Sequence, residues 1–311
     1  TKEKKGTLLW VLDHTKTAMG SRLIRQWLEK PLYNPLHVVR RQQAVSALCD
    51  DVIARSALSD ALQKIFDLER LIGRITYGTA NCRDLRALSS AIACLPEIRE
   101  HAAQFSQPML REITQNMDLL EDIHALVELS IVDEPPILLR EGGMIRTGYN
   151  EEIDYLRDLA SGGKGKIAEI EQTEREKTGI SKLKIGYNRV FGYYIEVSKS
   201  NIDAVPDHYI RKQTLANGKR YITEELKQLE STVLGAQERL TALEYEVFVS
   251  VRDQIADQVH RVQKTAQAVA SLDVLCALAE VACDNNYTCP VVDFSDKIEI
   301  HDGRHPVVEK M

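Results

Sequence analysis

The sequence predicts a mainly α protein, in which a helical bundle core is joined to long antiparallel helices with a small antiparallel β insert at their tip. Apolar residues recur at spacings of three and four over most of the 311-residue chain, as on the buried side of a helix. Residues 224–283 contain no proline and a single glycine. Residues 182–222, between two such helical stretches, instead combine tyrosines, alternating apolar positions and turn residues, which is typical of short strands.

The first 130 residues carry the signals of several helices joined by short links. Asn34 followed by Pro35 is typical of an N-cap and a first helical residue, and predicts a helix that continues to about Leu48. Apolar residues at helical spacing before Pro96 and after Pro108 predict two further helices. This part of the chain is therefore expected to form a compact helical bundle.

Two long helices are predicted, from about Asn150 to Lys177 and from Thr223, a good N-cap, to about Cys283. The second begins with a heptad seam, formed by Leu226, Leu229, Val233, Ala236, Leu240, Leu243 and Val247. A helix of this length is not stable alone in water, so the two helices are expected to pack antiparallel, with the insert at their far tip.

The insert is expected to form two hairpins. Leu183, Ile185 and Tyr187 would share one strand face, and residues 188–192 would form the first turn. The sequence Ala-Asn-Gly at 216–218 predicts the second turn, because Asn and Gly tolerate a positive φ. The simplest arrangement is a small sheet with one apolar face against the helix ends and one exposed basic face.

Charge concentrates in the insert. Residues 177–220 contain nine Lys or Arg and three Asp or Glu, a net charge of nine minus three, or +6, in a chain whose total is −6. A local basic field on an acidic chain predicts an anionic partner. Lys and Arg neutralise phosphates, while Asn, Gln and Thr add hydrogen bonds to phosphate oxygens, so such contacts would hold a duplex without reading its sequence. A solvated basic loop is the alternative. The candidate backbone-binding residues are Lys182, Lys184, Arg189, Arg211, Lys212, Gln213, Thr214, Asn217, Lys219 and Arg220.

The sequence lacks the common motifs of catalysis. It has no G-x-x-x-x-G-K-[ST], G-x-G-x-x-G or G-x-S-x-G motif, and Ser161 to Lys164 matches S-x-x-K without the partner motifs. The six cysteines show no C-x-x-C spacing and are expected to be reduced core residues. We therefore expect no catalytic residue, no metal and no cofactor.

Membrane and export signals are not expected either. No apolar run is expected to approach the ~18 to 20 residues that a membrane span needs, and the first residues do not resemble a secretory signal. The expected location is cytoplasmic, without a membrane partner.

Several segments resemble the bacterial DNA mismatch repair family MutS. LLWVLDHTKTAMGSRLIRQWLEKPL (8–32), DLERLIGRITYGTANCRDL (67–85) and GGMIRTGYNEEIDYLRDL (142–159) are similar to its core domain. LKIGYNRVFGYYIEVS (183–198) and YIRKQTLANGKRYITEEL (209–226) resemble its DNA clamp. NYTCPVVD (286–293) and GRHPVVE (303–309) are similar to the junction with its ATPase domain.

The resemblance implies four parts: core bundle and first lever helix in 1–163, clamp in 164–223, returning lever helix and core in 224–290, and the start of an ATPase domain in 291–311. Residues 291–300 are strand-like. The family's mismatch-reading and ATPase domains would lie outside this sequence, together with the ATP and Mg that the ATPase domain binds. The implied fragment is not an enzyme.

The implied function is to clamp the backbone of duplex DNA and to transmit the nucleotide state of the ATPase domain. The implied partners are double-stranded DNA, a second copy of the chain and a MutL-type repair protein. The alternative from another class is a coiled-coil scaffold whose basic tip binds an acidic protein.

Overall fold

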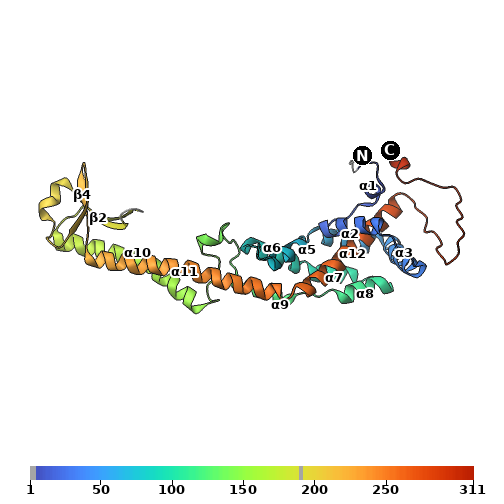
Figure 1. Cartoon of the computed structure of the whole chain (residues 1–311), viewed down its shortest axis with the longest axis horizontal. Helices are drawn as coiled ribbons and strands as arrows, with labels where there is room; N and C mark the ends of the chain where they lie inside the picture. Colours follow the sequence, from blue (N-terminus) through green and yellow to red (C-terminus); the bar gives the residue numbers. More distant parts are fainter. Residues whose placement is uncertain (1–4, 189–191) are drawn as a thin grey trace. The chain divides into compact units, whose positions relative to one another are not determined.

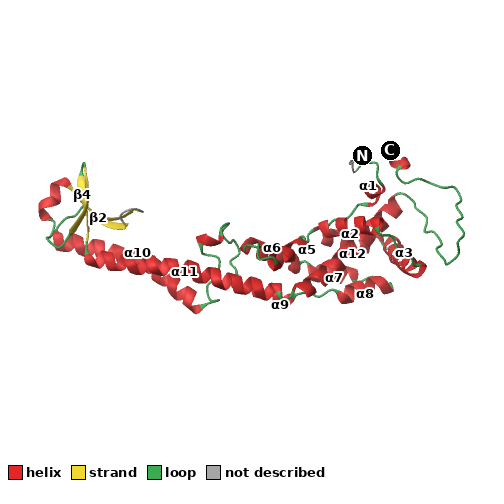
Figure 2. Cartoon of the chain, in the orientation of Figure 1, coloured by secondary structure: helices red, strands yellow, loops and turns green. Residues whose placement is uncertain are grey.

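The computed structural model describes residues 5–188 and 192–311, without the side chains of residues 163 and 164. The chain divides into two compact units. Unit 1 comprises Thr1–Ile137 with Val249–Met311, and unit 2 comprises Leu138–Phe248. The predicted fold class is confirmed, since helices dominate and the strands form one small antiparallel sheet (Figure 2). The boundaries of the four predicted parts stay a prediction.

Unit 1 is a bundle of helices. The predicted start at Pro35 is confirmed, since Asn34 Oδ1 accepts a hydrogen bond from Leu36 N at 2.9 Å and caps the helix. Pro108 likewise stands at the start of a helix, where its missing N–H is not needed. The described helices are α1 (Leu8–Leu12), α2 (Ala18–Glu29), α3 (Pro35–Asp50), α4 (Val52–Gln63), α5 (Leu68–Thr76), α6 (Cys82–Ala93), α7 (Leu95–Ala102), α8 (Pro108–Asn116), α9 (Glu121–Ser130), the end of α11 (Glu224–Ala256), α12 (Val259–Asp284) and the 3-10 turn η3 (Val308–Lys310).

Helix α12 is the centre of unit 1 and packs against α2, α3, α4, α5 and α8 (Figure 1). By length and composition it is apolar enough to cross a membrane, so the expectation that no such run exists was wrong. In its most apolar window, 67% of the residues are buried inside unit 1. A largely buried core helix is apolar because most of its surface packs against other helices of the protein.

The single helix predicted from Thr223 to Cys283 is in fact two. Helix α11 ends at Ala256 and α12 begins at Val259. Arg261, near the start of α12, binds Asp118 and Asp122 through its guanidinium, at 2.7–3.0 Å. These partners come from a distant part of the chain, so the break has no signal in the local sequence.

The strand-like stretch 291–300 is irregular, which corrects the prediction of a strand. Its apolar side chains are exposed, with Ile298 at 87% and Ile300 at 74%. A strand needs a hydrogen-bonded neighbour, and no residue in the described ranges 5–188 and 192–311 pairs with this stretch.

Unit 2 joins two long helices to the sheet. Its elements are η1 (Leu139–Glu141), α10 (Glu151–Thr178), β1 (Lys184–Asn188), β2 (Gly192–Ser198), η2 (Lys199–Ala204), β3 (Ile210–Leu215), β4 (Gly218–Ile222) and most of α11. The strands lie in the order β1-β2-β4-β3, and all neighbours are antiparallel. The second predicted turn is confirmed in place, because residues 216–217 join β3 to β4, although neither Asn217 nor Gly218 has a positive φ. β1 ends at Asn188 and β2 begins at Gly192, so residues 189–191 of the first predicted turn lie outside the described residues.

A small core holds the sheet on the helix ends. It contains Ile180, Leu183, Ile195, Val197, Tyr209, Tyr221, Ile222 and Leu226. Helix α10 ends and helix α11 begins at this core, so the two helices run antiparallel, as predicted (Figure 1). Asn150 Oδ1 caps α10 by accepting from Ile153 N at 3.0 Å, and Thr223 Oγ1 accepts from Leu226 N at 3.3 Å.

Candidate nucleic-acid interface

The basic side chains of the sheet do not share one face. Residues directly opposite each other in an antiparallel pair point to the same side. Lys219 pairs with Val197, and Arg211 pairs with Tyr221, so both cations lie on the side of the apolar residues. Arg211 is exposed on the edge strand β3, whereas Lys219 is half-buried on the inner strand β4. The prediction of one apolar and one basic face was therefore wrong.

A β-bulge changes the alternation along β3. The register shifts between Arg211 and Gln213, so Lys212 is the extra residue of that strand. After the bulge, Gln213 pairs with Arg220 and Thr214 with Lys219. The bulge therefore interrupts the regular alternation of side chains between Arg211 and Gln213. Lys212 and Thr214 are both exposed.

The side chain of Arg220 is bound by other residues of the sheet. Its Nε donates to Glu196 Oε2 and its Nη1 to Gln213 Oε1, each at 3.0 Å. Its guanidinium also lies over the ring of Tyr194, 4.0 Å from the centroid. Arg220 therefore joins β2, β4 and β3 on one face and neutralises Glu196. This structural role depends on strand register and could not be seen in the sequence.

A hollow of about 520 Å³ lies at one end of the sheet, beside the C-terminal part of α10. It brings together three predicted site residues, Lys182, Lys184 and Asn217. Polar residues that the prediction missed also line it, among them Arg175 and Ser198. Arg175 lies on α10, and its helical position gave no reason to group it with the strands. The remaining lining residues are Ser181, Glu196, Val197, Leu215 and Gly218.

Gly218 is needed for the close approach of β4 to β2. A Cβ at this position would lie 2.4 Å from Val197 O, a backbone atom that cannot move aside. The neighbouring Asn217 has an exposed side chain, while its carbonyl oxygen accepts from Lys199 N at 3.0 Å. The turn is therefore fixed through its backbone and leaves the amide of Asn217 available to a ligand.

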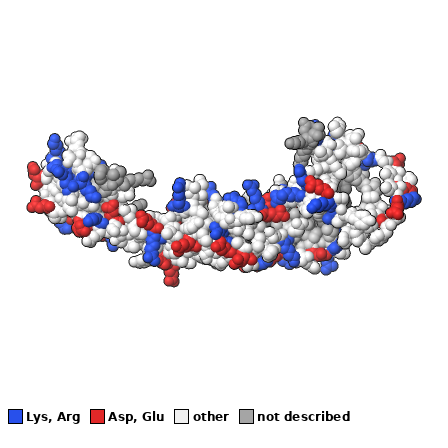
Figure 3. All heavy atoms as spheres, in the orientation of Figure 1, with Lys and Arg blue, Asp and Glu red and all other residues white. Residues whose placement is uncertain are grey.

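Several cations near the sheet have no partner among the described residues. Figure 3 shows Lys and Arg side chains gathered over the sheet of unit 2. Among the residues that the structure describes, four of the predicted cations have side chains without a hydrogen bond or ion pair: Lys182, Lys184, Arg211 and Lys219. We call these four the free cations. Arg189, the remaining predicted cation of the first turn, lies outside the described residues.

Two tyrosines belong to the core of the insert. Tyr209 and Tyr221 are buried, with ring centroids 5.9 Å apart. The hydroxyl of Tyr209 donates to the buried Glu174 of α10, and burial together with this hydrogen bond raises the pKa of Tyr209. Tyr187 is half exposed, while it contacts Tyr193 at the edge of the core. The buried contacts tie the sheet to α10 and fix the position of the free cations.

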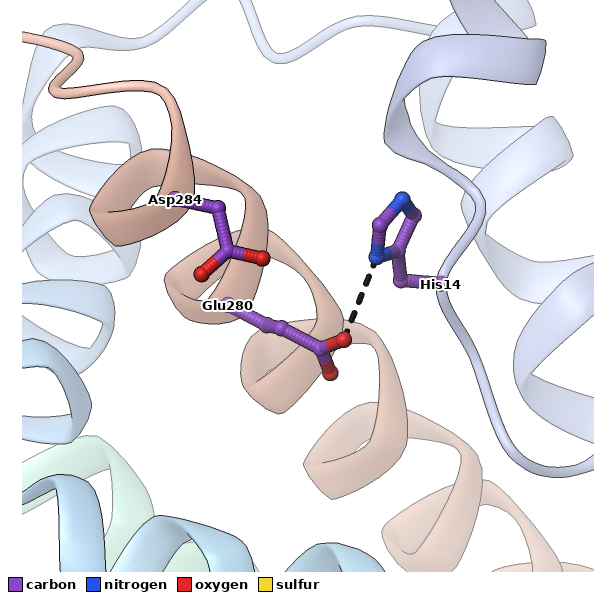
Figure 4. Close-up of side chains that lie close together, drawn as sticks. All are labelled: His14, Glu280 and Asp284. Carbon is purple, nitrogen blue, oxygen red and sulfur yellow. Dashed lines mark hydrogen bonds and ion pairs between the residues drawn. The ribbon is translucent and has the colours of Figure 1, made fainter.

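Unit 1 contains a cluster of potential metal ligands, formed by His14, Glu280 and Asp284 (Figure 4). Their ligand atoms lie within 4.8 Å of one another. Glu280, however, already contacts His14 Nδ1 at 3.2 Å and Lys16 Nζ at 3.3 Å. Burial alone would raise the pKa of Glu280, but His14 and Lys16 together lower it. The cluster is therefore satisfied as an ion-pair network between α12 and the segment before α2.

The chain is similar in sequence to the proteins of one family. The model of the MutS domain III family matches residues 1–279. The DNA mismatch repair protein MutS of Alkaliphilus oremlandii is 52% identical over 310 residues, and that of Ruminiclostridium cellulolyticum is 50% identical over 310 residues. The alignments cover 100% of this chain but 35% and 36% of the two relatives, so the chain spans about a third of their length.

Proposed function

Because the chain belongs to the MutS domain III family, we propose that it is the DNA-clamping and lever part of a DNA mismatch repair protein. In this proposal the sheet of unit 2 binds the backbone of double-stranded DNA without reading its sequence. Helices α10 and α11 transmit to the sheet the state of a nucleotide-binding domain outside this sequence.

The free cations are the observation that carries the proposal. Their charge is not compensated by other described residues, although the chain as a whole has a net charge of −6. Uncompensated Lys and Arg side chains at the surface are what a polyanion needs, because their binding to phosphates releases condensed counterions. Arg220 is not part of this set, since its guanidinium is already bound to Glu196 and Gln213.

The kind of contact favours the phosphate backbone over the bases. Flexible Lys side chains act as point charges, and the exposed amide of Asn217 can donate a neutral hydrogen bond to a phosphate oxygen. Lys182 and Lys184 line the hollow, Arg211 lies on the edge strand β3, and Lys219 lies on β4. These cations are therefore not on one face of a helix that could enter a major groove. Contacts of this kind position a duplex and carry no sequence information.

Salt dependence tests the proposal. We expect two labelled duplexes of equal length, one GC-rich and one AT-rich, to bind with affinities that agree within about threefold in fluorescence anisotropy. Four phosphate contacts predict a slope of log affinity against log salt of about −3.6, at about −0.9 per contact. An affinity that does not fall with salt would contradict the proposal, as would strong preference for one duplex.

An acidic protein partner is the competing function and needs its own measurement. Polyglutamate carries negative charge without the geometry of a duplex, so it is a suitable competitor against the labelled DNA. We expect duplex DNA to compete far better than polyglutamate at equal total charge. Equal competition would favour a protein partner for the basic region.

The wider activities of the relatives are also proposals for this chain. We propose that in the full-length protein it works as a cytoplasmic dimer with a MutL-type repair partner, and that this part does not hydrolyse ATP. ATP turnover by the chain, measured by phosphate release with and without duplex DNA, should equal that of the buffer. Turnover that persists after further purification and disappears on unfolding would contradict the non-catalytic role.

A further inference from the structure

Two cysteines of unit 1 meet where helices α3 and α12 end. Cys49 lies in the last turn of α3, and Cys283 lies in the last turn of α12. The thiol of Cys49 contacts Ala279 O at 3.6 Å. Ala279 precedes Cys283 by one helical turn, so Cys283 lies on the side of α12 that faces Cys49.

Arg55 shows independently that the two cysteines are neighbours. Its Nη1 donates to Leu48 O at 3.0 Å and to Cys283 Sγ at 3.2 Å. Leu48 is the residue before Cys49, so one nitrogen atom bridges the end of α3 and the sulfur of Cys283. The neighbouring Cys283 contributes, after burial, to raising the pKa of the Cys49 thiol, which agrees with this placement. Neither cysteine is fully buried.

We propose that Cys49 and Cys283 form a reversible disulfide by exchange with a low-molecular-weight disulfide such as oxidised glutathione. The thiolate of one cysteine attacks the small disulfide, forms a mixed disulfide and releases one small thiolate. The second cysteine loses its proton, attacks the protein sulfur of the mixed disulfide and releases the second small thiolate. The two protein thiols are oxidised by two electrons, the small disulfide is reduced to two thiols, and the two protons pass to these thiols.

The structure gives a small disulfide access to the pair. Cys49 lines an apolar hollow of about 660 Å³, which is wide enough to admit a small molecule. Cys283 lies beside it at the end of α12 and accepts a hydrogen bond from Arg55. Burial, with the neighbouring Cys283, raises the pKa of Cys49 to about 12, so the exchange should become faster as the pH rises.

The other cysteines are less suited to this reaction. Cys82 and Cys276 are buried in the core. Cys94 contacts Ser90 O and Lys64 O, away from the pair. Cys289 is exposed and lines the same hollow as Cys49, so it is the natural competitor for Cys49.

The bond would tie together the last turns of α3 and α12, which are otherwise the parts of the helices most prone to fray. The chain leaves α12 directly after this point, at Asn285. We therefore expect oxidation to raise the melting temperature of the protein and to slow proteolysis just after residue 284. Disulfides of cytosolic proteins are usually transient and redox-sensing, which fits a reversible bond at half-buried thiols.

Oxidised glutathione, added to the folded chain, tests the proposal. After alkylation in denaturant, the free thiols should fall from six to four, and peptide mass spectrometry should find Cys49 linked to Cys283. Dithiothreitol should restore all six thiols. The matched control Cys94→Ser should also show two fewer free thiols and the same increase in stability on oxidation.

The variants Cys49→Ser and Cys283→Ser should form no such link, and oxidation should leave their melting temperatures unchanged. A link between Cys49 and Cys289 would overturn the proposal. Glutathione addition at Cys289 alone, with Cys49 and Cys283 still free, would overturn it as well.

Discussion

Arg157 on α10 donates a hydrogen bond from Nη2 to Oε1 of Glu244 on α11 at 2.9 Å, although the side chain of Glu244 has no exposed surface. The same carboxyl group accepts from Gly143 N, and Arg157 also donates to Ile145 O. One buried ion pair therefore fixes the two long helices and the segment before α10 to one another. A rigid connection of this kind is needed if α10 and α11 are to move together as one lever.

Breaking this pair from one side should destabilise unit 2. In Arg157→Met the carboxylate of Glu244 stays buried without its charged partner, a situation that costs about 3–5 kcal/mol for fully buried pairs. Because Arg157 is 29% exposed and water can partly replace it, we expect about 2–4 kcal/mol. Urea denaturation, followed by a probe in unit 2, measures the change.

A second Arg–Glu pair between the same helices is the matched control. Arg239 binds Glu152, with side chains 69% and 49% exposed. We expect Arg239→Met to cost at most about 1 kcal/mol, as is usual for surface ion pairs. Equal destabilisation in the two variants would show that burial does not set the contribution of the Arg157–Glu244 ion pair to stability.

Two helical glycines should respond oppositely to the same substitution. A Cβ on Gly20 of α2 would lie 2.2 Å from Asp273 Oδ2, whereas a Cβ on Gly73 of α5 meets nothing within 4 Å. We expect Gly20→Ala to destabilise unit 1 by about 1–3 kcal/mol through overpacking, and Gly73→Ala to stabilise it by about 0.5–1 kcal/mol. Thermal unfolding of both variants checks the signs, and a tolerated Gly20→Ala would contradict the close packing of α2 on α12.

Asp273 should make the stability of unit 1 depend on pH. Burial raises its pKa above the ordinary value of 3.8, although Lys16 N, Thr17 N and Thr17 Oγ1 all donate hydrogen bonds to it. A carboxyl group with a raised folded-state pKa favours folding when protonated, so its contribution is lost as the pH rises through that pKa.

The pH dependence is isolated by comparison with Asp273→Asn, which cannot titrate. The difference in unfolding free energy, wild type minus variant, should fall as the pH rises above the ordinary pKa of 3.8 and through the raised folded-state pKa. Urea titrations at several pH values give this difference. A difference that stays constant, or rises with pH, would contradict the raised pKa.

Substitutions of Arg220 and Lys184 should distinguish an effect on stability from an effect on DNA binding. Arg220→Ala removes hydrogen bonds to Glu196 and Gln213, so we expect it to destabilise unit 2 by about 1–3 kcal/mol. Lys184→Ala removes a free cation and should change stability by no more than about 0.5 kcal/mol, while it weakens duplex binding. Urea denaturation and anisotropy on the same samples check both expectations. A marked destabilisation by Lys184→Ala would show that this lysine is not free.

The sequence predicted the elements that local signals define. Asn34 and Asn150 cap the helices where expected, and Asn217 lies in the turn between β3 and β4. Each of these features depends on a few neighbouring residues, so the local sequence is enough to predict it. The heptad seam that begins at Leu226 likewise predicted the long helix α11, since it buries Leu226 and Leu240.

Features that depend on distant partners could not be predicted. The break between α11 and α12 coincides with the binding of Arg261 to Asp118, a residue far away in the chain. The positions of Lys219 and Arg220 follow from strand register, and a one-residue shift reverses which face a side chain takes. The sequence therefore predicted the basic region but not which of its cations are free. Whether they bind DNA stays a prediction.

The salt dependence of duplex binding, measured for a variant without the free cations, tests the central claim most directly. The variant carries Lys182→Ala, Lys184→Ala, Arg211→Ala and Lys219→Ala. Its control removes four exposed cations of unit 1, Arg25, Lys30, Arg111 and Lys264, and so has the same net charge. We predict that the slope of log affinity against log salt falls by about 0.9 for each phosphate that the variant no longer binds, and stays unchanged in the control. Slopes that are equal in the variant and the wild type, or that fall equally in the control, would contradict the claim that the sheet of unit 2 holds the DNA backbone.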